Sequence, residues 1–319
     1  MNQIKGAQDS ITRLDTIALQ TSDGHVMVIV PSFGGNVAQL QLKKDDHLYS
    51  VLNGNQRPAE FSGKSIFKGA QLLPFANRLN NGRFAFAGQG YQMALNYPEE
   101  GHACHGFVYE QPFNVLHTKK SDGQVQARLS YDYHGSISGF PFPFRTELTY
   151  DLSNEQGFTC QTRVINTGQQ AMPLSHGWHP FLQIENRSID DLQLQLPPAY
   201  RLELNSRMIP TGHQRPFLQF IQKTLIGSTE LDDCFRLEEN GDRIQYIELT
   251  DPSRDLTLRL WQESGTHKYN YVQIYTPPNR QSIAVEPMTS NVDAFNNGRD
   301  LIVLKPGQAF TAAFGIQMG

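Results

Sequence analysis

Cysteine is scarce in this sequence, and neither sign of charge dominates it. The 319 residues include only Cys104, Cys160 and Cys234, and an odd, sparse set does not form a disulfide framework. Such a set is typical of a reducing compartment, so we expect a cytoplasmic protein. The 27 basic and 31 acidic residues give a net charge of −4, which predicts no nucleic acid and no membrane surface as partner. No apolar run approaches the ~20 residues of a membrane span, and residues 1–8 lack the pattern of a secretory signal.

Several chemical signatures are missing as well. The sequence has no Gly-rich dinucleotide loop, no phosphate-binding loop and no Gly-x-Ser-x-Gly elbow, which excludes the commonest nucleotide-dependent and serine-hydrolase sites. No cysteines and histidines have the spacing of a structural zinc site. Two His-x-x-His pairs are present, His102/His105 and His176/His179. Residues three apart in a strand point to opposite faces, so we favour acid–base use of these histidines over metal binding and expect neither a metal nor a cofactor.

Helical periodicity is nearly absent, and alternation of apolar with polar residues takes its place. Residues 125–133, 144–152 and 158–164 each alternate with period two and are separated by turn residues, which predicts three neighbouring antiparallel strands. Only residues 293–297 suggest a helical turn. No linker divides the chain, so we predict one all-β domain over residues 1–319, a large antiparallel β-sandwich or barrel with residues 1–10 as a loose arm. Further strands are predicted at residues 26–30, 37–42, 192–196, 200–204, 256–260 and 310–318.

A carboxylate follows an apolar strand near the C-terminus. Residues 282–285 are predicted to form that strand, and because Pro287 cannot donate to a ladder we expect the strand to stop there. Glu286 is then either a solvated strand end or a base directed into a cleft, since sites are often built at the rim of a sheet.

Other polar residues stand in apolar surroundings. Asn77 and Arg78 form either a solvated turn or a fork of donors for sugar hydroxyls. Asp232 is either the start of a turn or an acceptor of hydroxyl hydrogens. Trp178 can stack on a sugar ring or belong to the core. For Cys104 and Cys234, packing is a commoner role than catalysis.

Taken together and in this order, these segments resemble the aldose 1-epimerase family from about residue 33 to the C-terminus. Each motif alone is weak, but five in the same order are specific. The motifs are Asn77-Arg78-Leu79 with Asn81-Gly82-Arg83-Phe84, His105-Gly106-Phe107, His179-Pro180-Phe181, Asp232 to Phe235, and Ala284 to Thr289 with Asp293-Ala294-Phe295-Asn296 and Leu304-Lys305-Pro306-Gly307.

The resemblance implies a galactose-mutarotase-like supersandwich that acts on a small-molecule sugar, as a monomer or homodimer. It implies Glu286 as general base, His179 as general acid and His105 as a second histidine assisting at the ring. It also implies that Arg78 and Asp232 hold hydroxyls. The sequence departs from the family pattern at two places. His102 stands where many members carry Asn, and the usual Phe-Asn pair after Phe181 is missing. The second histidine motif also contains His176, which is an additional candidate acid.

Interconversion of sugar anomers requires only that the anomeric hydroxyl loses a proton while the ring oxygen gains one. Glu and His have ordinary pKa values of ~4.3 and ~6.5, which suit these two roles near neutrality. We expect a mutarotase acting on a free aldohexose, with Asn77, His176 and Trp178 as further substrate-binding candidates. The alternatives are a hexose-6-phosphate 1-epimerase, with Lys64, Lys68 or Arg83 near the phosphate, and a non-catalytic carbohydrate-binding module. A glycoside hydrolase is disfavoured, because Asp232 is a less convincing second carboxylate.

Overall fold

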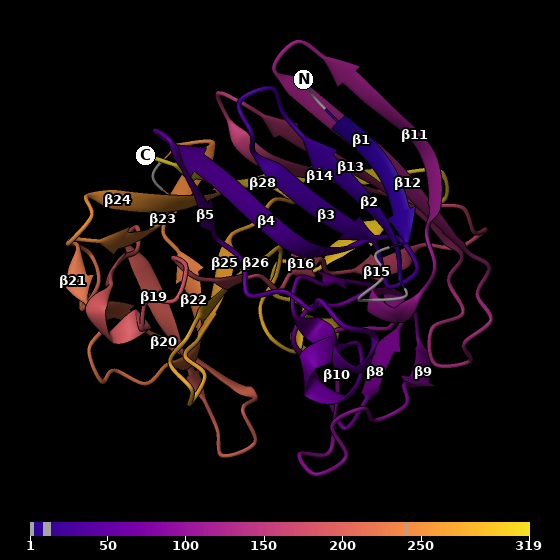
Figure 1. Ribbon diagram of the computed structural model, residues 1–319. Coiled ribbons are helices and arrows are strands. Elements are labelled where there is room, and N and C mark those ends of the chain that lie inside the picture. The colour runs from indigo at the N-terminus through magenta and orange to yellow at the C-terminus, as the bar shows by residue number, and fades with distance from the viewer. Residues whose placement is uncertain (1–2, 9–13, 240) are drawn as a thin grey trace.

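Strands make up nearly all the regular structure in the computed structural model of this protein, which describes residues 3–8, 14–239 and 241–319 (Figure 1). Within these ranges the strands of every sheet pair antiparallel. No helix in the described ranges is long and apolar enough to cross a membrane. The helical segments are α1 (Ala294–Asn297) and the short 3₁₀ segments η1 (Pro58–Glu60), η2 (Gly63–Phe67), η3 (Val108–Glu110) and η4 (Ile189–Asp191).

Three large sheets form the body of the protein, and the first is a five-stranded meander in chain order. Its strands are β1 (Gln3–Gln8), β2 (Asp15–Gln20), β3 (Val26–Val30), β4 (Asn36–Lys44) and β5 (His47–Ser50). We expected a loose arm over residues 1–10. At residues 3–8 the structure differs from this expectation, because these residues form β1 and pair with β2 along its whole length. Residues 1–2 and 9–10 lie outside the described residues.

The second sheet has nine strands, and the C-terminal strand lies inside it between two distant segments. The order is β11-β12-β13-β14-β28-β24-β23-β18-β21. The bounds are β11 (Asn114–Ser121), β12 (Gln124–Tyr133), β13 (Phe144–Ser153), β14 (Gly157–Asn166), β28 (Ala309–Met318), β24 (Leu256–Glu263), β23 (Ile244–Asp251), β18 (Gln193–Gln195) and β21 (Thr224–Leu225). The three neighbouring strands predicted from alternation are β12, β13 and β14, and the prediction is confirmed.

The third sheet has eight strands and includes the short segments around the histidine and glutamate motifs. The order is β20-β19-β22-β25-β26-β16-β6, and β17 also pairs with β26. The bounds are β20 (Pro210–Phe217), β19 (Ala199–Leu204), β22 (Asp232–Leu237), β25 (Tyr271–Tyr275), β26 (Ile283–Met288), β16 (Gly177–Trp178), β6 (Gln71–Leu72) and β17 (Phe181–Leu182). Smaller pairs are β7 (Arg78–Asn80) with β10 (His102–Cys104), β8 (Arg83–Phe86) with β9 (Gln89–Gln92), and β15 (Met172–Leu174) with β27 (Ile302–Leu304).

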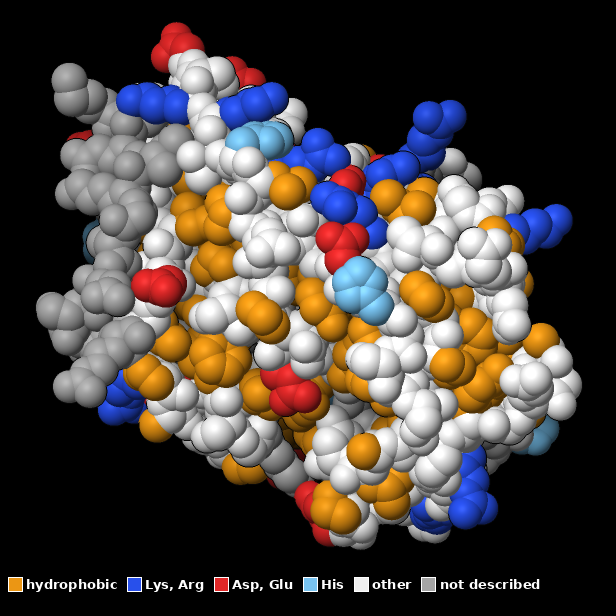
Figure 2. Space-filling view, turned by 90° about the vertical axis from the view of Figure 1, so that its right-hand side faces the viewer, with side chains coloured by type: hydrophobic (Ala, Val, Ile, Leu, Met, Phe, Trp, Pro, Cys, Tyr) orange, Lys and Arg blue, Asp and Glu red, His pale blue; other side chains and the backbone are white. Residues whose placement is uncertain are grey.

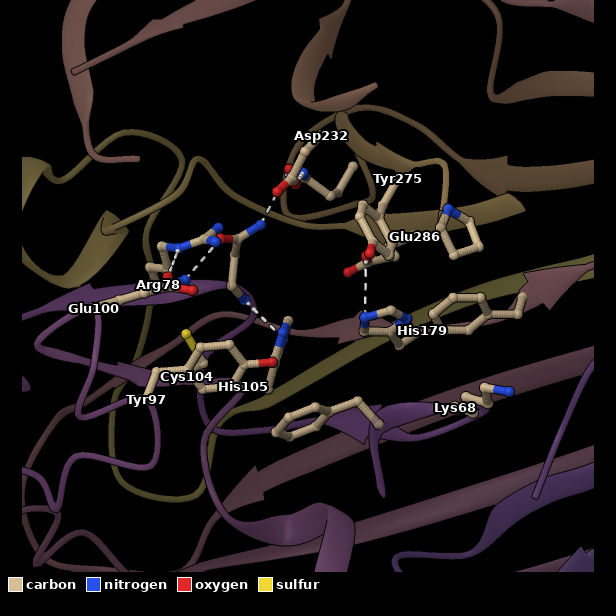
Figure 3. A pocket seen from close by; sticks show the side chains of 15 residues that line it. Lys68, Arg78, Tyr97, Glu100, Cys104, His105, His179, Asp232, Tyr275 and Glu286 are labelled. Atoms are coloured by element: carbon tan, nitrogen blue, oxygen red, sulfur yellow. Dashed lines mark hydrogen bonds and ion pairs between the residues drawn. The ribbon is translucent and has the colours of Figure 1, made fainter. Parts of the chain in front are cut away.

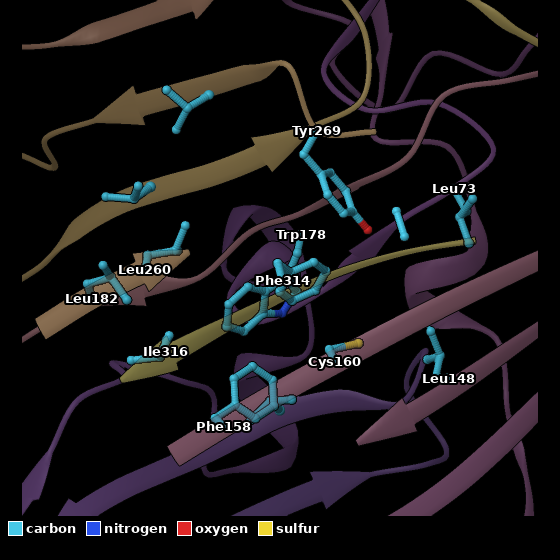
Figure 4. Packing of buried hydrophobic residues seen from close by; sticks show 14 of the residues in the cluster. Leu73, Leu148, Phe158, Cys160, Trp178, Leu182, Leu260, Tyr269, Phe314 and Ile316 are labelled. Atoms are coloured by element: carbon cyan, nitrogen blue, oxygen red, sulfur yellow. The ribbon is translucent and has the colours of Figure 1, made fainter. Parts of the chain in front are cut away.

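The five- and eight-stranded sheets together cover one face of the nine-stranded sheet. Tyr150 of β13 donates a hydrogen bond to the carbonyl of Gly35, between β3 and β4, at 2.7 Å. Elsewhere on the same sheet, Trp178 of β16 stacks on Phe314 of β28 with ring centroids 4.7 Å apart (Figure 4). On the other face of β14, Gln161 is exposed. The alternation left a sandwich or a barrel open, and the fold is the large antiparallel β-sandwich that the family resemblance implied.

The surface of the protein carries charges of both signs. In the view of Figure 2, Lys and Arg side chains are interspersed with Asp and Glu and with uncharged and hydrophobic side chains. No basic stripe dominates this face, which agrees with the near balance of acidic and basic residues in the sequence.

The predicted end of the strand at Pro287 is wrong, because β26 continues to Met288. The N–H groups of Val285 and Thr289 donate to the carbonyls of Pro180 and His176, so position 287 faces the same neighbouring segment. That position falls in the gap between β16 and β17, where no ladder bond has to be made. The missing N–H of proline therefore costs no hydrogen bond, and Glu286 lies inside the sheet instead of at its rim.

Candidate active site

A pocket opens on the face of the eight-stranded sheet that points away from the main core (Figure 3). The sheet alternation explains which side chains reach it, since Ile283 and Val285 of β26 enter the main core and Glu286 points to the other face. The lining residues are Phe67, Lys68, Asn77, Arg78, Tyr97, Glu100, Cys104, His105, His179, Phe181, Asp232, Gln273, Tyr275, Pro277 and Glu286.

Glu286 and His179 meet in this pocket. Oε1 of Glu286 lies 3.2 Å from Nε2 of His179, and the two residues are only 2% and 8% exposed. The His179 ring stacks on Phe181, with ring centroids 5.0 Å apart. Its backbone is fixed as well, because its N–H donates to the carbonyl of Ala70 and its carbonyl accepts from Gly69. The carboxylate and the imidazole are therefore in direct contact and nearly dry.

Burial shifts both groups toward their neutral forms. It raises the pKa of Glu286 well above its usual value, with a further increase from Asp232 and an opposing effect of Arg78. Burial also lowers the pKa of His179 to about 3. Because each group resists charging alone, the pair favours holding one proton between its two members over a wide range of pH.

Asn77 and His105 hold each other in a tight double turn. The Asn77 N–H donates to Nδ1 of His105 at 3.2 Å, and the His105 N–H donates to the Asn77 carbonyl at 3.0 Å. Both residues have left-handed backbones, with φ of 61° and 64°, which is the kind of strain that functional sites retain. The accepting Nδ1 places the proton of the neutral ring on Nε2. The next residue has to be Gly106, because a Cβ there would lie 1.9 Å from the carbonyl oxygen of Leu73.

Arg78 and Asp232 lie on another side of the pocket, within a chain of polar contacts. Nε of Arg78 donates to Glu100 at 3.0 Å, and the Arg78 backbone accepts a hydrogen bond from Asp293. Gln273, which lies opposite Glu286 in the ladder, donates to Asp232 at 2.7 Å and accepts from the Asn77 amide at 3.1 Å. These contacts leave a cation and a carboxylate held in place beside the Glu286–His179 pair (Figure 3).

Comparison with known proteins identifies the family to which this chain belongs. The sequence profile described as Aldose 1-epimerase matches residues 15–317, which is nearly the whole chain. The chain belongs to the aldose 1-epimerase family.

Relatives and solved structures extend this result. The uncharacterized protein YihR of Escherichia coli is 26% identical over 306 residues, which cover 94% of this chain and 92% of the relative. Human galactose mutarotase is 25% identical over 199 residues, 59% of this chain and 54% of its own. A galactose mutarotase-like protein from Clostridium acetobutylicum has the same fold, with a TM-score of 0.86 over 100% of this chain and 98% of its own at 19% identity.

The sequence predictions for this family member divide into residues that reach the pocket and residues that do not. Those brought together are Glu286, His179, His105, Arg78, Asp232 and Asn77. The first and last of these lie on segments more than 200 positions apart, yet all line one cavity. Their roles in catalysis and binding stay predictions until they are measured.

The prediction that His176 and Trp178 bind substrate is wrong, because both residues belong to the core. His176 is fully buried, with Nδ1 2.9 Å from the Tyr269 hydroxyl and Nε2 3.0 Å from Oε1 of Gln71. Trp178 is also fully buried, and its indole N–H donates to the carbonyl of Gly69. The reason is strand alternation through β16, which sends 176 and 178 inward and 177 and 179 toward the pocket.

The members of the first His-x-x-His pair are separated too, because His102 belongs to β10 whereas His105 follows it in the left-handed turn. His105 lines the pocket, while His102 is fully buried and its Nε2 lies 2.9 Å from the carbonyl of Arg207. Among the described residues no three His, Cys, Asp or Glu side chains are grouped as a metal site would require. Cys104 lines the pocket, but burial raises its pKa to about 12, so its thiol stays protonated near neutrality.

Several pocket residues were missed by the sequence analysis. Gln273 is the polar residue in the otherwise apolar strand β25, and that interruption was a readable signal. Glu100, Tyr97 and Tyr275 had no such signal, because they lie in polar or aromatic surroundings that are common on any surface. Of the basic residues considered for a phosphate, Lys68 lines the pocket, Arg83 is exposed on β8 and donates to Gln92, and the Lys64 side chain lies outside the described structure.

Proposed function

We propose that this protein is an aldose 1-epimerase that interconverts the α and β anomers of a free aldohexose. The observation that carries the proposal is the buried contact between Glu286 and His179 in a pocket that also presents Arg78 and Asp232. The anomeric hydroxyl and the ring oxygen of a hemiacetal are bonded to one carbon. A base and an acid that touch each other can therefore reach both oxygens at once.

The reaction balances with the groups present. The Glu286 carboxylate takes the proton of the anomeric hydroxyl, while protonated His179 gives its proton to the ring oxygen as the bond from that oxygen to the anomeric carbon breaks. The product is the open-chain aldehyde. Rotation about the bond between the first two carbons presents its other face, and the reversed transfers close the ring to the other anomer.

Burial of the pair supports this cycle. Each opening converts carboxylate plus imidazolium into carboxylic acid plus imidazole, and each closure reverses the change, so one proton remains on the pair throughout. The neutral pair that burial favours is therefore the state reached when the ring opens. Nε2–H of His105 is available to donate to a sugar oxygen, and Arg78 with Asp232 can fix the hydroxyls by charge-assisted hydrogen bonds.

A binding module without catalysis is the less favoured alternative. Binding of neutral hydroxyls does not require a nearly dry Glu–His contact, which burial makes costly to maintain in charged form. We further propose that the protein acts in the cytoplasm, which agrees with three free cysteines in the described chain.

Polarimetry tests the proposal directly. Freshly dissolved α-D-glucose or α-D-galactose should approach the same final rotation faster with the protein than without it. The Glu286→Gln variant should lose most of this acceleration and still bind the sugar. If the wild-type protein binds the sugar but does not accelerate the change in rotation at any protein concentration, the binding module would be established instead.

A further inference from the structure

The motif Asp293-Ala294-Phe295-Asn296 follows the strand of Glu286 but lies outside the pocket lining. Asp293 directly precedes α1 and is only 6% exposed. An aspartate in this position usually caps the first turn of its own helix, and here the side chain makes no such bond. Its backbone is left-handed, with φ of 57°, so contacts elsewhere must hold it in this strained conformation.

Asp293 bonds to β7 instead. Its N–H donates to the carbonyl of Arg78 at 3.0 Å, and its Oδ1 accepts from the N–H of Asn80 at 2.9 Å. These two backbone groups of β7 stand on either side of Leu79 and point to the same edge of the strand. Asp293 therefore satisfies that edge as a residue of a neighbouring strand would.

The strand β7 depends on such a contact because its sheet is small. It pairs with β10 along its other edge, and no further strand of the described chain joins the two. A two-stranded ribbon is only marginally stable by itself. The motif adds two more anchors: Asn296 donates to Oδ1 of Asp293 at 2.7 Å and to the carbonyl of Arg83 at 2.9 Å, and Phe295 packs edge-on against Phe84 of β8.

This ribbon carries Arg78 into the pocket, where its Nε donates to Glu100 (Figure 3). Glu286 lies on β26, and residues 289–292 join that strand to Asp293. The joining segment is fixed at its start, because the N–H of Thr289 donates to the carbonyl of His176 at 2.9 Å. Asp293 therefore connects the strand of the proposed base to the ribbon of the proposed sugar-binding arginine.

We propose that Asp293 is a positioning residue, which holds β7 so that Arg78 meets the sugar hydroxyls in register with Glu286. This role rests on the proposed epimerase function, because it concerns the same pocket. It goes further by giving the Asp-Ala-Phe-Asn motif a task in the reaction without any contact with the sugar.

Two substitutions of Asp293 separate its side chain from its backbone. Asp293→Gly adopts the left-handed backbone without strain and keeps the N–H, but it loses Oδ1. Asp293→Asn keeps an oxygen acceptor and tolerates the same backbone. In the polarimetric assay we expect kcat/KM to fall roughly 10- to 100-fold in the glycine variant and to stay within about threefold of wild type in the asparagine variant.

The loss should appear mainly as an increase in KM, because an arginine that holds hydroxyls does so in the substrate and in the transition state alike. Asp45→Gly is the matched control, since Asp45 is also a left-handed aspartate but stands on an exposed turn. This control should leave kcat and KM unchanged.

A double-mutant cycle shows whether the loss passes through Arg78. In the Arg78→Met background, Asp293→Gly should lower kcat/KM by less than about threefold, because the side chain that it positions is gone. An equal loss in both backgrounds, an equal loss in the glycine and asparagine variants, or no loss in either would overturn the positioning role. The epimerase proposal would stand in each of these cases.

Hydrogen exchange tests the contact without any assay of activity. The N–H of Asn80 should exchange slowly in the wild type, since Oδ1 of Asp293 accepts from it. Exchange as fast as that of an exposed amide would refute the contact, even if Asp293→Gly does not fold. If the wild type epimerises no sugar, the proposed function fails. Titration calorimetry with glucose and galactose then decides on Asp293, because Asp293→Gly should weaken binding as Arg78→Met does, and wild-type affinity would refute the role.

Discussion

Glu286→Gln is the substitution that separates chemistry from folding most cleanly. Glutamine has nearly the same shape, and its amide oxygen can keep the 3.2 Å contact that Oε1 makes with Nε2 of His179. It has no basic carboxylate, so the anomeric hydroxyl loses its proton acceptor. General-base catalysis contributes about 10²- to 10⁴-fold, and we expect kcat to fall by that factor while sugar affinity changes little.

The same variant has a predicted effect on stability. A carboxyl whose pKa is raised in the folded state stabilises the protein fully at a pH below its pKa in the unfolded chain. This stabilisation is lost as the pH rises toward the raised pKa of the folded state. Glutamine does not titrate. The stability of Glu286→Gln relative to wild type should therefore increase as pH rises above 4.5, by up to about 1.4 kcal/mol per pH unit until the raised pKa is passed.

Polarimetry and urea unfolding at several pH values measure the two effects. Glu155→Gln, on an exposed turn, is the matched control and should change neither. Turnover of Glu286→Gln within about threefold of wild type would refute Glu286 as the base, because so small a loss lies outside the range of general-base catalysis. A relative stability that does not rise with pH would refute the raised pKa.

Four further outcomes follow from the described contacts. His179→Asn should lose about 10²- to 10⁴-fold in kcat and remain folded. His176→Asn should instead lose about 2–4 kcal/mol of unfolding free energy through its two buried hydrogen bonds, and a larger rate loss there than at position 179 would reverse the assignment. The rate on neutral sugars should not fall as pH drops through the ordinary histidine value of 6.5, since burial lowers the His179 pKa to about 3; an acid limb near pH 6.5 would contradict this. Trp178→Ala should lower the free energy of unfolding, measured in urea, by about 3–5 kcal/mol. An increase in KM without loss of stability would show that the indole contacts the sugar.

Strand alternation could be predicted from the sequence wherever a strand was long and had one solvated face. In β14, exposed Gln161 and Arg163 alternate with buried neighbours, so the period of two was visible without any knowledge of the fold. The position of β28 between β14 and β24 was not visible, because it depends on pairing between distant segments.

The candidate site was predicted in part for a similar reason. The family motifs located Glu286, His179 and Arg78, but β16 is only two residues long and carries no readable alternation, so His176 and His179 could not be told apart. The prediction that the strand ends at Pro287 was wrong, because a proline removes a ladder hydrogen bond only on the side that its nitrogen faces. That side is decided by the partner strand, not by the local sequence.

The polar chain across the pocket has a consequence for how the protein acquires activity. Asn77 and Gln273 are 196 positions apart in sequence, yet the Asn77 amide donates to the Gln273 side chain, which in turn donates to Asp232. Contacts of such separation are slow to form, since the intervening chain must first be ordered. Enzyme activity in this protein is consequently a late reporter of folding: during synthesis, no competent pocket exists until the segment carrying Glu286 has emerged and entered the sheet.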